Sequence, residues 1–243
     1  MTSIVWGRHP QEAYDNPYEY EAQAQFLREA KALLNDLNLQ LDTYTLHYHR
    51  DERTLKKATW MLSLDLVDGL LECALLLEEK RHRPAARLFR DAVETIDLLK
   101  LLHSPTPRAV EVLNQWYENI TVPHRVYREY LEEIAGDEAA KARKAYFDEL
   151  SKFTHRTYRA LSDSYSLGRD NLLVHDSHSK QLIVLPQTIA AYLAVLSDLI
   201  VQATDCLAQT GVLSEEAIAT SRSQALETHT VPRRFAIRSQ NGN

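Results

Sequence analysis

A row of charged side chains lies on one face of the helix that we predict over residues 84–103. Arg87, Arg90, Asp91 and Glu94 are spaced at i, i+3, i+4 and i+7, so they share that face. Arginine binds phosphate through several N–H donors, and a carboxylate orients an arginine or takes part in proton transfer. The row therefore predicts either a site for an anionic substrate or a network of structural ion pairs.

Carboxylates on the preceding helix are expected partners for this row. Asp65, Asp68 and Glu72 share one face of the helix predicted over residues 52–80. If the two helices form a hairpin, Glu72 lies near Arg90. We expect a polar seam between the helices, which is either a structural ion network or part of a ligand site.

His155 is the candidate for proton transfer, because histidine titrates near neutral pH. Ser151 and Tyr158 lie within one helical turn of it in the helix predicted over residues 137–166. The apolar stripe of that helix leaves His155 out, so an ordinary surface histidine is the alternative.

Arg169 and His175 form a second pair of interest, in which arginine would hold phosphate and histidine would do acid–base work. His175 also begins a short group with Asp176 and His178. A tetrahedral metal site needs more ligands, and the chain has no HExxH, paired ExxH or CxxC motif. We expect a polar hairpin tip there, with no metal and no other cofactor.

The composition favours long helices. The chain has 243 residues, of which 44% are hydrophobic and 26% charged, and only six are glycine. Glycine supplies the tight turns of sheets and phosphate-binding loops, so its scarcity predicts few turns. The net charge of −6 gives no general attraction to nucleic acid, and contact with RNA would need a local basic patch.

The cysteines and apolar runs predict a cytoplasmic protein that does not enter a membrane. Cys73 and Cys206 lie in apolar helical runs, which fits a reducing compartment. The first thirty residues show no basic region followed by an apolar one, as a signal peptide would. The longest apolar runs, such as residues 70–77, are too short to span a bilayer.

Hydrophobic periodicity predicts an all-α fold, a bundle of long antiparallel helices. The helices are expected over residues 18–49, 52–80 (with Asp51 as N-cap), 84–103, 106–120, 123–136, 137–166 and 186–209, with a last short helix after Ser214. A small β-hairpin insertion is expected near 171–185, formed by strands 171–175 and 181–185.

One helical domain is expected over residues 18–226. An extended arm, residues 1–17, precedes it, and a flexible basic tail, residues 227–243, follows it. The tail carries Arg233, Arg234 and Arg238 with one aromatic residue, a composition suited to nucleic acid or to a partner groove.

Two segments together resemble an uncharacterised bacterial all-helical family related in architecture to HEPN domains. They are RLFRDAVE at residues 87–94 and LSKFTHRTYRAL at residues 150–161, and the resemblance covers roughly residues 55–205. It implies a helical bundle, often dimeric, and a metal-independent ribonuclease of toxin–antitoxin or phage-defence systems. Arg169 and His175 match the family's Arg-x(4–6)-His spacing, but between a helix and a strand rather than at the start of a helix.

Two functions stay open. In the first, the chain binds or cleaves RNA, with His155, Glu94 and Arg90 as catalytic candidates and Arg87, Tyr158, Arg169 and His175 as substrate-binding candidates. In the second, it is a non-enzymatic interaction or regulatory protein whose polar seam is structural. The candidate partners are RNA, a second copy of the chain in a homodimer, or a cognate protein.

Overall fold

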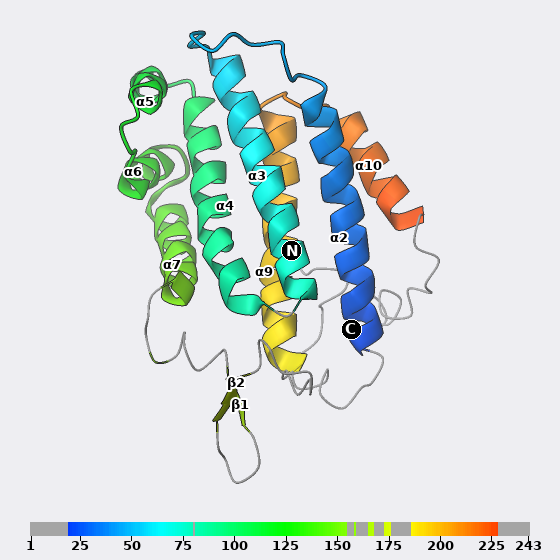
Figure 1. The fold of residues 1–243 in the computed structure, drawn as a ribbon. Helices are drawn as coiled ribbons and strands as arrows, with labels where there is room; N and C mark the ends of the chain where they lie inside the picture. The colour runs from blue at the N-terminus through cyan, green and yellow to red at the C-terminus, as the bar shows by residue number, and fades with distance from the viewer. Residues whose placement is uncertain are drawn as a thin grey trace.

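The computed structural model describes residues 19–79, 81–154, 158, 165–167, 173–175 and 186–227 (Figure 1). Its helices are α2 (Glu19–Asp42), α3 (Leu55–Glu78), α4 (His82–Leu102), α5 (Pro107–Tyr117), α6 (His124–Ala135), α7 (Asp137–Thr154), α9 (Pro186–Gln209) and α10 (Glu215–Glu227). Two three-residue strands, β1 (Tyr165–Leu167) and β2 (Leu173–His175), pair antiparallel. The expectation of a helical fold is therefore confirmed for the described residues.

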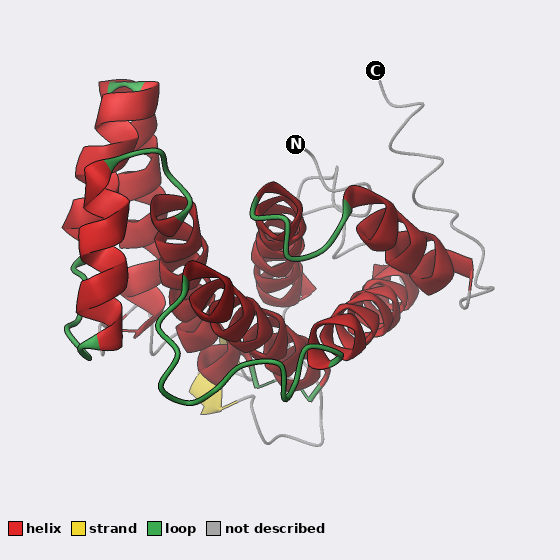
Figure 2. Ribbon diagram, turned by 90° about the horizontal axis from the view of Figure 1, so that it is seen from above, coloured by secondary structure: helices red, strands yellow, loops and turns green. Residues whose placement is uncertain are grey.

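Helix α9 is the centre of the helical assembly. It packs against α2, α3, α4 and α10, and its buried residues Leu193, Leu196 and Leu199 have no exposed surface. Figure 2, seen from above, shows α5 and α6 at one side, running across the direction of the long helices. Helix α7 packs against α4 and α6, so α4 joins the central helices to this side group.

Apolar residues at helical spacing within residues 84–103 predict a core face for α4, and the structure confirms it. Ala85, Phe89, Ala92, Ile96 and Leu99 are each at most 5% exposed. Their spacing of three and four residues places them on one stripe, and burial of such a stripe is the main driving force for docking the helix.

The helix boundaries near the top of Figure 1 differ from the predicted ones. Helix α2 ends at Asp42 rather than near residue 49, and Leu46 has a φ of 72° in the turns that follow. The N-cap of α3 is Thr54, whose side chain accepts a hydrogen bond from the Lys57 N–H, and Asp51 was the wrong choice.

The buried side chain of Lys57 binds the backbone of the segment just before α3. Lys57 Nζ donates to the carbonyl oxygens of His49, Arg50 and Glu52 at 2.8, 2.6 and 2.9 Å. These carbonyls converge on one cation and so cannot continue a regular helix ladder. Periodicity does not reveal such a contact.

The segment after α7 also differs from the prediction. The helix expected to reach residue 166 is described as far as Thr154 and again at Tyr158, and residues 165–167 form β1 instead. The hairpin expected at 171–185 is not shown, because β2 pairs with the upstream residues 165–167 and residues 176–185 lie outside the described part. Residues 1–18 and 228–243, which hold the expected arm and tail, also lie outside it.

Both cysteines are buried thiols, as their apolar surroundings predict. Burial raises the pKa of the Cys206 thiol to about 11 and raises that of Cys73 further. In the described part of the chain, no helix has both the length and the apolar character needed to cross a membrane.

We expect both thiols to be unreactive in the folded protein. A thiol with a pKa of about 11 is roughly one part in a thousand thiolate at pH 8, and the thiolate is the reactive form. Addition of a chromogenic disulfide reagent should release no colour until denaturant is added, after which both cysteines should react. Rapid reaction of either thiol without denaturant would contradict this account of the core.

Replacing Lys57 by methionine should lower the free energy of unfolding by about 1–3 kcal/mol, because three carbonyls lose the charged donor that they share. Urea denaturation followed by circular dichroism measures the change. Lys56→Met, at the exposed neighbouring lysine, is the matched control and should have little effect. Equal stability of the two variants would show that the Lys57 contacts do not hold the turn.

Candidate functional site

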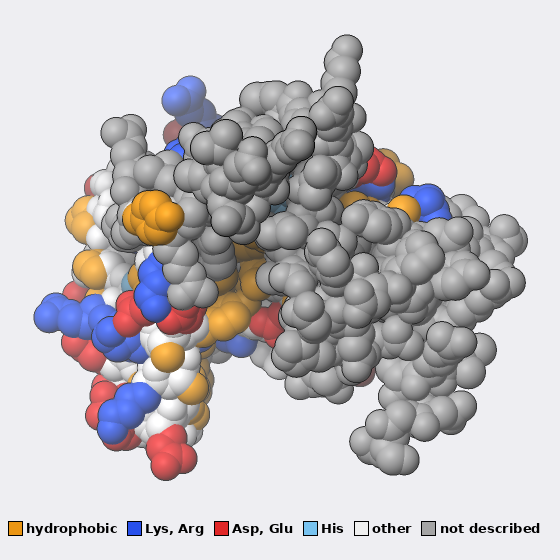
Figure 3. Space-filling view, turned by 90° about the horizontal axis from the view of Figure 1, so that it is seen from below, with side chains coloured by type: hydrophobic (Ala, Val, Ile, Leu, Met, Phe, Trp, Pro, Cys, Tyr) orange, Lys and Arg blue, Asp and Glu red, His pale blue; other side chains and the backbone are white. Residues whose placement is uncertain are grey.

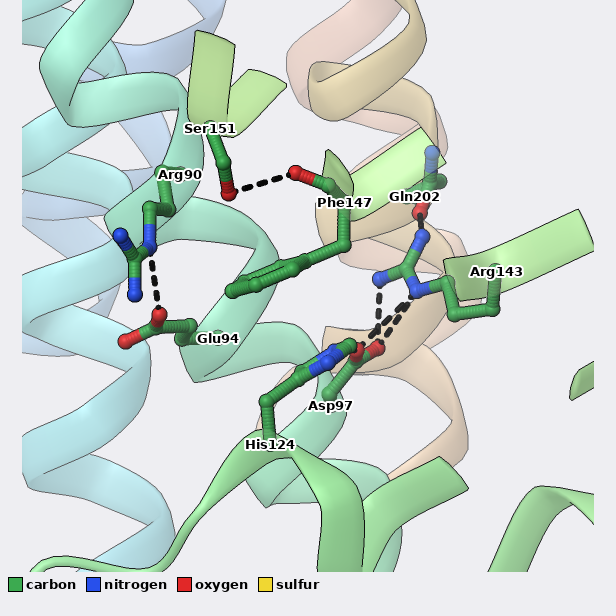
Figure 4. Close-up of polar contacts among 8 residues, drawn as sticks. All are labelled: Arg90, Glu94, Asp97, His124, Arg143, Phe147, Ser151 and Gln202. Carbon is green, nitrogen blue, oxygen red and sulfur yellow. Dashed lines mark hydrogen bonds and ion pairs between the residues drawn. The ribbon is translucent and has the colours of Figure 1, made fainter. Parts of the chain in front are cut away.

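A buried carboxylate connects four helices on the α5–α7 side of the molecule. Asp97 of α4 is 1% exposed, and Arg143 Nε lies 2.9 and 3.0 Å from its two oxygens. His124 Nε2 lies 2.7 Å from Asp97 Oδ2, and Arg143 Nη1 donates to Gln202 Oε1 at 2.8 Å. We call these four residues the Asp97 network (Figure 4).

Local structure explains how these side chains meet. Asp97 directly follows the core residue Ile96, so α4 presents it beside the core stripe, toward α6 and α7. His124 is the first residue of α6, after the extended residue Pro123. Gly136, with a φ of 85°, provides the left-handed turn between α6 and α7, which lets α7 pack beside α6 and bring Arg143 to Asp97.

The network balances charge that would otherwise be costly to bury. Burial works against the charged form of Arg143, but the hydrogen bonds and charge of Asp97 outweigh it and raise the pKa of Arg143 overall. Burial and the nearby Asp97 charge raise the pKa of the Tyr127 hydroxyl, so this residue stays neutral. A buried ion pair of this kind persists because each charge has a close partner.

An open hollow of about 480 Å³ adjoins the network. Arg90, Glu94 and His124 contribute its polar lining, and Trp116 and Phe147 are among its apolar and aromatic walls. Arg90 Nε donates to Glu94 Oε1 at 2.8 Å, and the Arg90 guanidinium lies 4.9 Å from the centre of the Phe147 ring.

The Phe147 ring connects the Arg90–Glu94 pair to the Asp97 network. Its centre lies 3.9 Å from that of the His124 imidazole, and the two rings are nearly parallel. Figure 4 shows Phe147 between Arg90 and His124. An imidazole fixed by a carboxylate and an adjacent guanidinium are the groups that proton transfer beside an anion requires. In this protein, however, Arg143 also binds the carboxylate and Glu94 occupies the guanidinium.

The structure brings together some of the residues predicted for the site. Arg90 and Glu94 form an ion pair, whereas Arg87 is exposed and forms no ion pair with another described residue. Tyr158 is 80% exposed. His155, Arg169 and the side chain of His175 lie outside the described part, so their expected roles stay predictions.

The ion pairs predicted between α3 and α4 do not form among the described residues, although Asp65, Asp68, Glu72 and Asp91 line one groove between the two helices. Asp68 accepts a hydrogen bond from Asn38 of α2 at 2.5 Å, and Arg90 pairs within its own helix. Within the described residues, no ion pair joins α3 to α4. The hairpin geometry was therefore right in placing the two helices side by side, but wrong about which charges meet.

Sequence reasoning missed all four members of the Asp97 network. One signal was available for Asp97, which stands alone as an acid among apolar neighbours in the run Ile96–Leu99. Arg143 lies in a run rich in basic residues and Gln202 in an apolar helix, and neither has a distinguishing pattern. Their partnership depends on how α6, α7 and α9 pack onto α4.

Comparisons with protein-family models, with curated proteins and with solved structures found no match to this chain. Among the described residues, no group of three or more histidine, cysteine or acidic side chains is arranged to hold a metal ion. The site must therefore be interpreted from its own geometry.

Replacing Asp97 by asparagine should destabilise the fold by about 3–5 kcal/mol, because it leaves the Arg143 guanidinium buried without a counter-charge. Chemical denaturation measures the loss, with the exposed Asp148→Asn as control. We expect the apolar double change Asp97→Leu with Arg143→Met to recover much of the stability. A single Asp97→Asn change that costs under about 1 kcal/mol would show that the ion pair is dispensable.

Proposed function

We propose that this chain is a non-enzymatic helical interaction protein and that its buried polar network is structural. The observation that carries the proposal is the closed state of the Asp97 carboxylate. Both its oxygens accept hydrogen bonds from Arg143, and one of them also contacts His124, in a place where the carboxylate is 1% exposed. A general base needs a free oxygen or nitrogen that reaches a substrate, and this carboxylate has no oxygen left for one.

The surface charges support the same proposal. On α7, Lys141 pairs with Asp137, Lys144 with Asp148, and Lys152 with Glu149. Figure 3, from below, shows basic and acidic side chains side by side over the described part of that face. RNA binding depends on a concentrated basic patch, and alternating charges do not supply one.

A second candidate function, RNA binding or metal-independent RNA cleavage of the HEPN type, is favoured by one observation. Arg90 and His124 line the same open hollow, one on each side of the Phe147 ring. In this proposal Arg90 and Arg87 bind phosphate, Glu94 orients Arg90, and His155 or His124 transfers the proton. A dimer of the chain would belong to this second proposal.

We also propose a cytoplasmic location, based on the two buried thiols, and an up-and-down arrangement of the long helices as one domain. The proposed arrangement of the helices agrees with the short connections between α3, α4 and α5.

An RNA cleavage assay distinguishes the two functions. We expect the purified chain to leave labelled single-stranded RNA intact in buffer with a metal chelator, at the level of the Arg90→Ala and His155→Ala variants. Lys144→Ala, which removes an exposed cation on α7, is the matched control for lost charge. Cleavage by the wild-type chain that falls at least about tenfold in Arg90→Ala or His155→Ala, but not in Lys144→Ala, would overturn the interaction proposal.

A further inference from the structure

An amphipathic groove runs between α3 and α4, apart from the Asp97 network. It has a volume of about 430 Å³. Its apolar lining includes Leu71, Leu75 and Leu88, and Leu75 is 45% exposed. Together these leucines give the groove an apolar floor on which a chain segment could dock.

The walls of this groove are acidic. Asp65, Asp68 and Glu72 line it from α3, and Asp91 lines it from α4. No lysine or arginine is among the described residues that line it. Like charges at i, i+3 and i+7 on one helix repel each other, so the groove surface carries a concentrated negative charge.

Two further features indicate that the groove is built for contact. Burial and the neighbouring charges of Glu94 and Asp65 raise the pKa of Asp91, although Arg90 partly offsets them. Gly69 stands in the groove in the middle of α3, where glycine weakens a helix relative to alanine. Nothing described lies within 4 Å of the position that a Cβ would occupy there, so internal packing does not require this glycine.

The chain itself contains a segment of complementary chemistry. Residues 231–238 read VPRRFAIR, with Arg233, Arg234 and Arg238 around Phe235 and Ile237. Residues 228–243 hold no acidic residue, in a chain that has 34 acidic and 28 basic residues. Basic side chains would meet the acidic walls, and the two apolar side chains would meet the leucines.

The segment is long enough to reach the groove. Figure 1 shows α10, α2, α3 and α4 in that order across the molecule, so α2 and α3 separate the end of α10 from the groove. An extended chain spans at most about 3.3–3.6 Å per residue, which gives roughly 20–22 Å from Glu227 to Arg233 and about 26–29 Å from Glu227 to Phe235. Two helix diameters are about 20–24 Å.

We propose that the acidic α3–α4 groove is a docking surface for the chain's own C-terminal segment, residues 231–238. Arginines 233, 234 and 238 pair with the carboxylates of the groove, and Phe235 and Ile237 cover its apolar floor. This inference deepens the proposed interaction function and rests on it, because the docked segment occupies the surface that a basic partner segment would use.

Trypsin cleavage after Arg233 and Arg234 in the full-length protein tests the docking. Mass spectrometry follows release of the C-terminal fragment, with a synthetic peptide of residues 228–243 as the undocked reference. We expect cleavage to be about tenfold slower in the protein than in the peptide at low salt, since cleavage follows the undocked population. The protection should disappear at 1 M salt, which screens exposed charge pairs.

Paired variants locate the docking surface. Asp65→Asn with Glu72→Gln should raise the cleavage rate about tenfold, whereas Glu132→Gln with Glu138→Gln, at exposed positions on α6 and α7, should leave it unchanged. Phe235→Ala with Ile237→Ala keeps both cleavage sites and should also remove the protection. Thermal unfolding of each variant confirms that the fold is intact.

Each outcome decides the proposal. Cleavage of the wild-type protein at the rate of the peptide overturns it, and so does protection that the groove variant leaves unchanged. Protection that grows with protein concentration supports docking between two copies. The RNA assay tests Arg90 and His155, whereas the trypsin assay tests the α3–α4 groove. Failure of the interaction proposal and failure of the docking proposal are therefore distinguishable.

Discussion

The packing of the α5–α7 side depends on the burial of one charge. Asp97 stands on α4, the helix that joins the central group around α9 to α6 and α7. A carboxylate with 1% exposure needs compensation from outside its own helix, and Arg143 and His124 provide it from α7 and α6. Gln202 then connects Arg143 to α9. The relative placement of four helices therefore depends on giving the Asp97 carboxylate its hydrogen-bond and charge partners.

Much of the helical framework follows from the sequence, because apolar spacing within one helix is a local property. The stripe from Ala85 to Leu99 on α4 is buried as expected, and α9 has the predicted bounds. The errors occur where a contact between distant atoms decides the local structure. Lys57 binds the carbonyls of His49, Arg50 and Glu52 in the segment before α3, and no periodic pattern carries that information.

The candidate site was predictable only in part, for a related reason. Spacing along one helix correctly joined Arg90 to Glu94, because an i, i+4 pair needs no tertiary knowledge. To predict a pair between two helices, one must know how each helix is rotated about its own axis. The predicted α3–α4 ion pairs failed on that point, because Asp68 accepts a hydrogen bond from Asn38 of α2 and Arg90 pairs within α4. Arg143 and Gln202 could not be identified from the sequence, because their partners come from other helices.

Helix α4 therefore carries two kinds of carboxylate. One is buried and holds the fold together, and the other is exposed and open to contact. Asp97 lies beside the core stripe, where an unpaired charge would prevent folding, so it has strong partners. Asp91, less than two turns earlier, faces the open α3–α4 groove, where water tolerates an unpaired charge. Since folding does not require the acidic groove to be neutral, its charge remains available to a basic segment. The buried Asp97 network fixes how the helices pack against each other. The exposed Asp91 on the same helix favours contact with basic segments.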